Sequence, residues 1–292
     1  MQLALQLLSF HRTNTLEPLL RSLEAQTNKD WVLYWQDNAS TPDELLTMKK
    51  IVEAVRPSFD IIWFDSAENM GFDGGHERLY HEHNAEYILC VNDDVILEPA
   101  YIATLRQYVD DHHDVGAVEG MVLRWHFGPH RQTIEKTRVV DSLGLQKTRF
   151  HKVYDIDSGK VLIDPPEEPT GVWGVSGCLP MYRRAALREQ LFDPAYFMYK
   201  EDVDVAYRLN KTGWKSVMVP GAVAYHLRTF QSSLLHQGVS YRSQILSYRN
   251  HWRNLKKHLT WKDWLKDGWA ILPFEGAKAI FILGKAIYHH FL

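Results

Sequence analysis

Short apolar runs alternate with helical repeats through the first half of the chain. The runs are rich in aliphatic, β-branched and aromatic residues and predict strands at 3–8, 31–35, 61–64, 87–91 and 115–123. Helical patterns fill several of the gaps between them. This alternation predicts βαβ units, and therefore a largely parallel sheet covered by helices.

Two helices near the N-terminus have clear signals. Between about residues 15 and 25, leucines recur on one face and Pro18 falls in the first turn, where proline is tolerated. The next helix begins at "TPDE", where Thr41 can cap, Pro42 fits the first helical position and Glu44 completes a capping box. The inward positions of these two helices are Leu16, Leu19, Leu20 and Leu23, then Leu45, Met48, Val52 and Val55.

The second half is less regular. Residues 124–170 are mostly polar and predict either excursion loops or a β-rich insert over the sheet. The pattern returns at "GVWGVSGCLPMYRRAAL", at the helical "EDVDVAYRLNKTGW" and at the strand "KSVMVPGAVAYH". The last fifty residues form a weakly amphipathic helical pattern with four tryptophans, and its uncharged stretches are shorter than the ~20 apolar residues of a membrane span.

Composition places the chain among globular proteins. Of its 292 residues, 45% are hydrophobic and 12% aromatic, which is ample for a packed core and excludes a disordered or fibrous protein. Cys90 and Cys178 make neither a disulfide framework nor a zinc-like spacing, and the N-terminus lacks the features of a signal peptide. A reducing, cytosolic compartment is the simplest interpretation.

Charge is distributed unevenly around a net value of -3. Residues 241–292 contain nine Lys or Arg and three Asp or Glu, a balance of +6, which leaves -9 for residues 1–240. A basic, aromatic tail therefore follows an acidic body. Because the body is acidic and the basic residues of the tail are mixed with tryptophan and leucine, nucleic-acid binding fits poorly.

The strand at 87–91 runs directly into acidic residues. In "YILCVNDDVILEP", Asn92, Asp93 and Asp94 follow its carboxyl end, which is where open α/β sheets bind ligands. Adjacent carboxylates repel each other and are costly to desolvate, so a positive partner is expected. A divalent cation such as Mg²⁺ or Mn²⁺, together with phosphate, would meet that need. A solvated acidic turn is the alternative.

A second acidic cluster, "KEDVDVAYRL", lies at the start of a helix. The helix macrodipole favours carboxylates in a first turn, so helix stabilisation is one explanation. Helical spacing places Glu201 and Asp204 on one face and directs Asp202 elsewhere. One carboxylate can therefore face a cleft while the others serve the structure.

Glycines and one histidine complete the candidate chemistry. In "ENMGFDGGHERL" the glycines allow a close backbone approach to a ligand, but the spacing is neither GxGxxG nor a Walker A loop. His226 ends an apolar strand at "VAYH" and is within reach of a metal; a strand-end histidine with only structural partners is the alternative.

Together these segments resemble the family 2 glycosyltransferases of the GT-A fold, over nearly the whole chain up to about Asn254. The matching segments, in order, are "LSFHR", "QDNAS", "ENMGFDGG", "VNDDV", "VSGCLPMYRRAAL", "FDPAYFMYKEDVDVAYRL", "VAYH" and "SYRN". The resemblance implies a Rossmann-like, mostly parallel sheet. It also implies transfer of a sugar from a nucleoside diphosphate to an acceptor hydroxyl, with inversion at the anomeric carbon.

By the same resemblance, the loops after the first two strands hold the nucleobase and the glycine segment lines the nucleotide pocket. The donor-binding residues implied are Ser9, His11, Asp37, Asn69, Gly71, Gly75, Asn92 and Asp93. Candidates for the acceptor or phosphate side are Trp173, Gly177 and Arg249.

The resemblance also assigns a metal site and a catalytic base. Asp94 matches the last aspartate of the family's DxD motif, and His226 matches a histidine that completes the metal shell in some members. The first position of the motif is Asn92 here, which leaves the exact coordination of Mg²⁺ or Mn²⁺ open. The family's "ED" pair maps onto Glu201 and Asp202, of which Asp202 is our candidate for the base because of the helix geometry.

More narrowly, "VVDSLGLQKTRFHKVYDIDSGK" is similar to bacterial rhamnosyltransferases of cell-surface polysaccharide synthesis, which implies a dTDP-rhamnose donor. UDP-sugars remain an alternative donor. The acceptors implied are glycans or lipid-linked sugars at the cytoplasmic membrane face, and a basic tail with tryptophans suits that place. A helical lid packed on the body is the alternative for Trp252 and Trp261.

We therefore expect a GT-A catalytic domain at 1–240, with a nucleotide-binding part at about 1–125 and an acceptor-binding part at about 126–240, and a helical extension at 241–292. The nearest enzymatic rival, a sugar-phosphate nucleotidyltransferase, would need a glycine-rich basic signature near the N-terminus, which "LSFHRTNTLEP" lacks. A glycoside hydrolase would need no nucleotide pocket. A non-catalytic nucleotide- or glycan-binding protein is the rival from another class.

Overall fold

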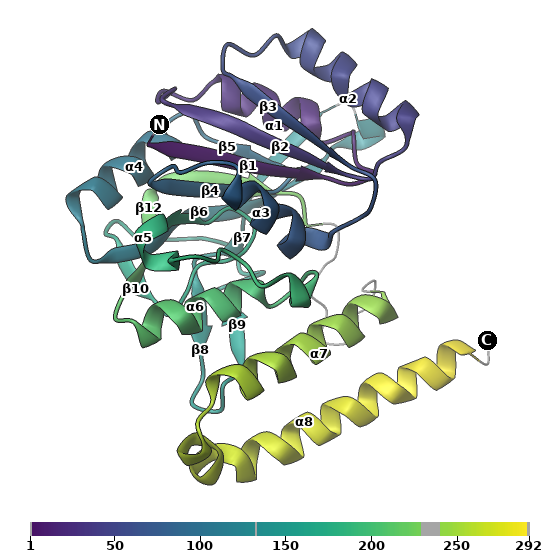
Figure 1. The fold of residues 1–292 in the computed structure, drawn as a ribbon, viewed down its shortest axis with the longest axis vertical. Coiled ribbons are helices and arrows are strands. Elements are labelled where there is room, and N and C mark those ends of the chain that lie inside the picture. Colours follow the sequence, from purple (N-terminus) through teal and green to yellow (C-terminus); the bar gives the residue numbers. More distant parts are fainter. Residues whose placement is uncertain (1, 132, 229–239, 291–292) are drawn as a thin grey trace.

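The computed structural model describes residues 2–131, 133–228 and 240–290. A large central sheet has helices on both faces, and two long helices follow at the C-terminal end (Figure 1). The architecture is mixed α/β, as the sequence predicts.

The central sheet has the strand order β10-β12-β6-β11-β4-β1-β2-β3, with β5 pairing with β12 and β7 with β6. Its strands are β1 (Leu3–Ser9), β2 (Trp31–Asn38), β3 (Ile61–Ser66), β4 (Tyr87–Val91), β5 (Val95–Leu97), β6 (Val115–Phe127), β7 (Ile134–Ser142), β10 (Thr170–Val172), β11 (Met181–Arg183) and β12 (Lys215–His226). The pairs β1–β2, β2–β3, β1–β4 and β6–β12 are parallel, whereas β11 lies antiparallel between β4 and β6. The expected parallel sheet is therefore confirmed for its main part.

Helices cover the two faces of this sheet in separate layers. The helices are α1 (Leu16–Glu24), α2 (Pro42–Val55), α3 (Gly71–His81), α4 (Tyr101–Asp111), α5 (Arg184–Leu187), α6 (Glu201–Lys211), α7 (Tyr241–His258) and α8 (Trp261–His290), with 3-10 turns at Pro129–Arg131 and Pro194–Tyr196. On β1, Leu3, Leu5 and Leu7 join a core with α1, α2 and α4. Ala4 faces α3, and α5 and α6 share a second core with β4 on that side. The predicted capping box at Thr41 and Glu44 is present.

The polar segment 124–170 is a β-rich insert, which decides between the two predicted alternatives. β6 continues past the predicted end at 123 to Phe127 because its outer half pairs with β7. A small antiparallel pair, β8 (Leu145–Lys147) and β9 (Val153–Asp155), follows. The insert therefore extends one edge of the sheet.

The last two helices pack in succession, α7 on α6 and α8 on α7. The buried Asn250 of α7 donates from Nδ2 to three carbonyl oxygens in the segment 196–199, at 2.8–2.9 Å. In that segment and just after it, Phe197, Tyr199 and Lys200 adopt positive φ angles of 69°, 71° and 72°. Non-glycine residues hold such conformations only when their surroundings enforce them. α7 thus fixes the loop that leads into the acidic helix α6.

The tryptophans of this region differ in their surroundings. Trp252 stacks on Trp264, with ring centroids 6.2 Å apart and an interplanar angle of 14°. Trp261 is exposed. The packed alternative therefore holds for Trp252 and is wrong for Trp261. In the part of the chain that the structure describes, every helix is too short or too polar to traverse a bilayer.

Candidate active site

The pairing of strands brings Asp94 and His226 together although 131 residues lie between them in the sequence. Asp94 directly precedes β5, and β5 pairs antiparallel with the end of β12, with His226 opposite Val95. Asp94 Oδ1 lies 3.1 Å from His226 Nε2. The backbone carbonyl of Asp94 accepts from Leu227 N and from Trp125 Nε1, each at 2.9 Å, so the acid is held in place.

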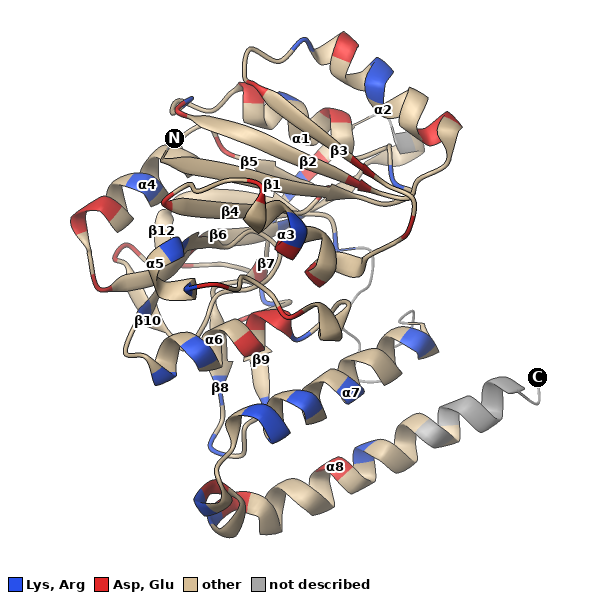
Figure 2. Ribbon diagram, viewed as in Figure 1, with Lys and Arg blue, Asp and Glu red and all other residues tan. Residues whose placement is uncertain are grey.

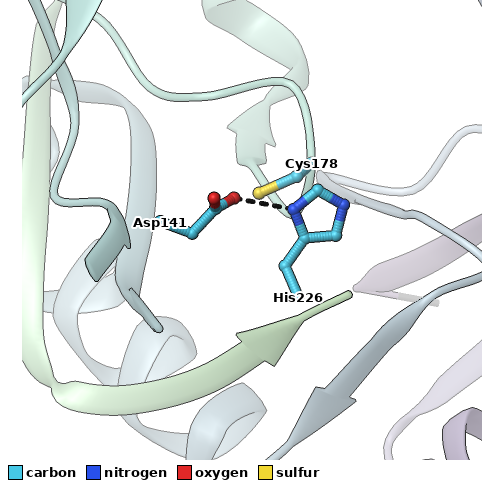
Figure 3. A group of neighbouring side chains, drawn as sticks. All are labelled: Asp141, Cys178 and His226. Carbon is cyan, nitrogen blue, oxygen red and sulfur yellow. Dashed lines mark hydrogen bonds and ion pairs between the residues drawn. The ribbon is translucent and has the colours of Figure 1, made fainter. Parts of the chain in front are cut away.

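The other ring nitrogen of His226 binds Asp141, a residue that the sequence analysis missed. Nδ1 lies 2.7 Å from Asp141 Oδ2 (Figure 3). Arg124 and Arg228 each place Nε 3.2 Å from Asp141 Oδ1. Strand register brings Asp141 and His226 together. β6 lies between β12 and β7, and Arg124 of β6 is opposite His226 of β12. A carboxylate bound to one ring nitrogen of a histidine fixes the orientation of the ring. Asp141 on Nδ1 therefore directs Nε2 of His226 toward Asp94.

Arg12 is the second residue that the sequence analysis missed, although it ends the segment "LSFHR". Its Nη1 lies 3.2 Å from Asp93 Oδ1 and also contacts Asp94 Oδ2. We expected a positive partner for the acids after β4. The protein itself supplies two cationic side chains beside them, Arg12 and His226. The expected positive partner is therefore present among the side chains, and the divalent cation stays a prediction.

This arrangement shifts the titration of all three groups. Burial lowers the pKa of His226, but the charges and hydrogen bonds of Asp94 and Asp141 outweigh it and raise the pKa to about 10. Burial opposes the charge of Asp94, yet His226 and Arg12 lower its pKa overall. Burial and the neighbouring Asp94 raise the pKa of Asp93 to about 7, against the effect of Arg12. Asp94 is thus the anionic member of the adjacent pair.

The described residues contain one group with metal-ligand spacing, Asp141, Cys178 and His226, whose ligand atoms lie within 4.8 Å of one another (Figure 3). Both oxygens of Asp141 already have cationic partners. Burial raises the pKa of the Cys178 thiol well above its usual value, which disfavours the thiolate that a metal requires. Asp94 fits better, because its buried Oδ1 faces His226 Nε2 at 3.1 Å and has no other partner among the described residues.

The acidic pair at the start of α6 separates as the helical spacing predicts. Glu201 is buried, and burial together with Asp202 raises its pKa to about 8. Asp202 is half-buried; its Oδ1 accepts from Val203 N at 2.7 Å and its Oδ2 from Gly177 N at 3.3 Å. Burial raises the pKa of Asp202, and these two backbone donors counteract it. Since Glu201 holds its proton at neutral pH, Asp202 is the better base of the two.

One short segment connects Asp202 with the Asp94–His226 pair. Gly177 N donates to Asp202, and the thiol of the next residue, Cys178, lies within 4.8 Å of a ring nitrogen of His226. The carbonyl of Cys178 also accepts from Asn92 N at 3.2 Å. Consecutive Cα atoms are about 3.8 Å apart. The acid of α6 and the acids after β4 therefore both lie close to the segment 177–178.

Glycine at position 177 leaves room for this close approach. A Cβ atom there would lie 3.0 Å from Glu201 Oε1 and 3.6 Å from Asp202 Cβ. Behind the same pair lies Asp73 of α3, which is fully buried and whose oxygens have no hydrogen-bond partner among the described residues. Burial, followed by the charges of Glu201 and Asp202, raises its pKa to about 10. A neutral acid thus supports the acidic start of α6.

Two of the residues expected to hold a nucleobase are buried and bind each other. Ser9 Oγ donates to Asp37 Oδ1 at 3.0 Å, and Ser40 N donates to Asp37 Oδ2 at 2.7 Å. The register of β1 and β2 places Ser9 opposite Asp37. His11 is exposed at the mouth of this corner and lies 2.7 Å from Glu44. Ser9 and Asp37 therefore shape the loops, and His11 is the accessible member of the group.

The glycine segment makes its close approaches within the protein. Gly71 has φ of 74°, and a Cβ there would lie 2.3 Å from the carbonyl oxygen of Phe197. A Cβ on Gly75 would lie 2.9 Å from Leu8. Asn69 Oδ1 accepts from Gly71 N at 2.8 Å and so forms the turn into α3. These contacts explain the glycines by packing.

The remaining acceptor candidates lie apart from one another. Trp173 packs edge-on against Tyr207 of α6, with ring centroids 4.9 Å apart. Arg249 lies on α7 and lines a surface hollow of about 710 Å³. The other residues lining this hollow are Tyr248, Trp252, Arg253, Lys256 and Lys257. Of the three acceptor-side candidates, only Gly177 contacts the acidic pair.

The sequence matches characterised proteins in two ways. A family model described as "Glycosyltransferase like family 2" matches residues 4–239. An N-acetylglucosaminyl-diphospho-decaprenol L-rhamnosyltransferase of Mycobacterium tuberculosis is 47% identical over 64 residues, which are 22% of this chain and 20% of that protein. The chain thus matches about a fifth of the length of this curated relative.

Solved structures match over most of the chain. GalNAc-T7, solved with UDP, GalNAc and Mn²⁺, has a TM-score of 0.65 at 14% identity and aligns with 88% of this chain and 48% of its own. The mannosyltransferase PcManGT from Pyrobaculum calidifontis, solved with GDP-Man and Mn²⁺, has a TM-score of 0.60 at 13% identity, over 98% and 75% of the two chains. The chain therefore belongs to glycosyltransferase family 2 and has the GT-A fold.

Proposed function

We propose that this protein transfers a sugar, most simply L-rhamnose from dTDP-rhamnose, to a hydroxyl of a glycan or lipid-linked acceptor by inverting single displacement. The observation that carries the proposal is the arrangement around segment 177–178. Gly177 N donates to the half-buried Asp202, and the next residue, Cys178, lies near His226, which faces the anionic Asp94. Donor activation and proton removal need such groups on opposite faces of one sugar.

The donor side is built from Asp94 and His226. These two residues would hold a divalent cation, which neutralises the charge that develops on the leaving diphosphate. An imidazole ligand favours Mn²⁺ over the harder Mg²⁺, which prefers oxygen ligands. Asp141 keeps the ring of His226 oriented, and Asn92 and Asp93 border the diphosphate. His11 would meet the nucleobase at the exposed corner beside Ser40.

The acceptor side is built around Asp202. Its carboxylate accepts the proton of the acceptor hydroxyl as that oxygen attacks the anomeric carbon, and the bond to the diphosphate breaks on the opposite face. Glu201, which retains its own proton, stays behind Asp202 and beside Gly177. Residues 1–240 would form the catalytic unit, with donor binding in about 1–125 and acceptor binding in about 126–240.

The rhamnosyl donor and the acceptor rest on sequence similarity. The Mycobacterium tuberculosis relative is named for L-rhamnosyl transfer to a decaprenol-linked sugar, which supports rhamnose and a lipid-linked acceptor here. A UDP-sugar is the alternative donor, because GalNAc-T7 was solved with UDP. A place on the cytoplasmic face of the membrane, in contact through residues 241–292, agrees with the basic tail.

A thermal-shift screen of dTDP, UDP and GDP, with and without Mn²⁺, tests the donor side. At 100 times its Kd a ligand stabilises the native state by about 2.7 kcal/mol. For a chain of this size that corresponds to a rise in Tm of roughly 5 °C. We expect the largest rise with dTDP and Mn²⁺ together. The absence of a shift with every nucleotide would contradict a nucleotide-sugar enzyme, and a UDP-selective shift would replace rhamnose as the donor.

A further inference from the structure

The helix α8 buries Ile271 and Ile282 but exposes a row of large apolar side chains on another side. Trp261, Leu265 and Trp269, at successive spacings of four residues, are 68%, 74% and 69% exposed. Leu272 and Ile280 are exposed as well and fall within the same arc of about 100° on the helix. We call these five residues the outward stripe. A contiguous apolar surface of this kind marks an interaction site.

Two acids of α8, Asp267 and Glu275, face the protein. Glu275 is buried, and its Oε1 lies 3.1 Å from His251 Nε2 of α7. Asp267 is also buried, with Oδ1 3.4 Å from Arg149 Nε. These two acids thus attach α8 to the rest of the protein, and the outward stripe lies on the side of α8 that faces away from α7. Trp261 and Trp269 are thus exposed, whereas these two acids are not.

We infer that the outward stripe seats the protein on the surface of an anionic bilayer, with α8 lying in the membrane plane. Lys262 and Lys266 are exposed beside the stripe, and Lys262 Nζ lies 5.8 Å from the ring centroid of Trp261. Tryptophan and lysine together suit the headgroup boundary, where the ring is half-immersed and the cation meets anionic lipid. The core of a protein–protein interface, in contrast, is depleted of lysine.

The neighbouring helix supports an anionic partner. α7 presents several cations (Figure 2), of which Arg249 and Lys256 are exposed along its surface hollow. α8 itself does not meet the length and hydropathy needed to cross a bilayer. Contact in the plane of the membrane is therefore the geometry that fits. This inference adds a membrane-binding surface to the proposed function. It rests on that function only for the choice of the cytoplasmic membrane as the partner.

Vesicle sedimentation with the full chain tests the stripe. We expect the native protein to sediment with phosphatidylcholine vesicles that contain phosphatidylglycerol, and less with phosphatidylcholine alone. The combined variant Trp261→Ser, Leu265→Ser and Trp269→Ser should reduce the partition coefficient by at least about tenfold. The matched control, Leu46→Ser with Ile163→Ser, removes two exposed apolar side chains outside the helical extension and should bind as the native protein does.

The outcomes separate the alternatives. Native protein that stays in the supernatant, or a triple variant that binds equally well, overturns the inference. A dimer that the triple variant converts to a monomer, without vesicle binding, assigns the stripe to a second copy and also overturns it. The nucleotide thermal shift is measured on the same variant. A retained shift leaves the proposed function standing whatever the vesicles show.

A separate observation carries a second inference, which concerns Arg12. Its guanidinium lies against both Asp93 and Asp94, while His226 faces the other oxygen of Asp94. A divalent cation held by Asp94 and His226 would stand beside this guanidinium, and like charges so close repel strongly in a partly buried site. Arg12 is itself partly exposed, on the loop after β1, so it has space to turn.

We infer that Arg12 is a resident counter-cation that leaves Asp94 when a divalent cation binds and turns to the phosphates of the donor. This step rests on the proposed function. It makes the two ligands interdependent: the cation alone must displace Arg12, whereas nucleotide offers Arg12 a new anionic partner. By linkage, each ligand then strengthens the binding of the other by the same factor.

Titration of Mn²⁺, followed by the electron paramagnetic resonance signal of the free ion, tests this without any turnover. Without nucleotide, Arg12→Ala should bind Mn²⁺ at least about tenfold more tightly than the native protein. Addition of dTDP or UDP should tighten Mn²⁺ binding strongly in the native protein and weakly in Arg12→Ala. Arg21→Ala, which removes an exposed arginine paired with Glu17 on α1, is the matched control and should behave as native.

If Arg12→Ala binds Mn²⁺ no better than the native protein while nucleotide binding persists, the role of Arg12 is wrong and the proposed function survives. If neither protein binds Mn²⁺ with any nucleotide, the metal site and the role of Arg12 are both wrong.

Discussion

Asp202→Asn should lower kcat for sugar transfer by roughly 10²- to 10⁴-fold, which is the usual contribution of a general base. The amide keeps the shape of the side chain but cannot accept the proton of the acceptor hydroxyl. Nucleotide binding should stay near normal, because Asp202 accepts from Gly177 N and Val203 N and has no hydrogen bond or ion pair with Asp94 or His226 in the described structure. Initial rates with a nucleotide-sugar donor, together with nucleotide Kd values, measure both effects.

Glu201→Gln is the comparison that assigns the base. The raised pKa of about 8 means that Glu201 already carries a proton at neutral pH, so its replacement by the isosteric amide should cost far less than the change at Asp202. Full activity in Asp202→Asn, with loss in Glu201→Gln, would reverse the assignment. Full activity in both would contradict carboxylate base catalysis and favour a binding protein.

Asp94→Asn should weaken Mn²⁺-dependent nucleotide binding by at least about 100-fold, since loss of a ligand costs more than the 10- to 100-fold typical of residues that only orient ligands. Removing the anion also leaves Arg12 and His226 as neighbouring cations without their shared partner. Isothermal titration of nucleotide with and without Mn²⁺ measures the loss.

Asp93→Asn is the matched control for that experiment. It removes the adjacent carboxylate, which contacts the same arginine at 3.2 Å but has a pKa raised to about 7 and makes no ion pair with His226 in the described structure. We expect a markedly smaller loss than at Asp94. Equal losses in the two variants would mean that Asp94 has no special role in holding the cation.

The sequence predicted the candidate site best where one local rule decided the outcome. Polar residues at the end of the buried strand β4 had to lie at the carboxyl edge of the sheet, and they do. Helical spacing alone separated Asp202 from Glu201 and Asp204, and the burial of the latter two follows it. Both inferences depend only on residues a few positions apart.

Arg12 and Asp141 show where such reasoning fails. Arg12 meets Asp94 because the loop after β1 lies beside the end of β4, its parallel neighbour in the sheet. Asp141 meets His226 because the insert returns as β7 against β6. Either residue, taken in the sequence alone, resembles any polar residue on a loop or an edge strand. Their importance depends on register between strands that are far apart in the chain.

By itself, the sequence determined the alternation of strands and helices, the mostly parallel sheet, the edge at which the acids gather and the family to which the motifs point. These features follow from periodicity and from residue types that are close in the chain. Only the tertiary structure decided that Arg12 and His226 compensate Asp94, that Asp73 is buried behind Glu201, and that α8 turns Trp261 and Trp269 outward. Electrostatic compensation and the choice of a buried face depend on which distant segments come into contact, and that is decided when the sheet and its helices pack.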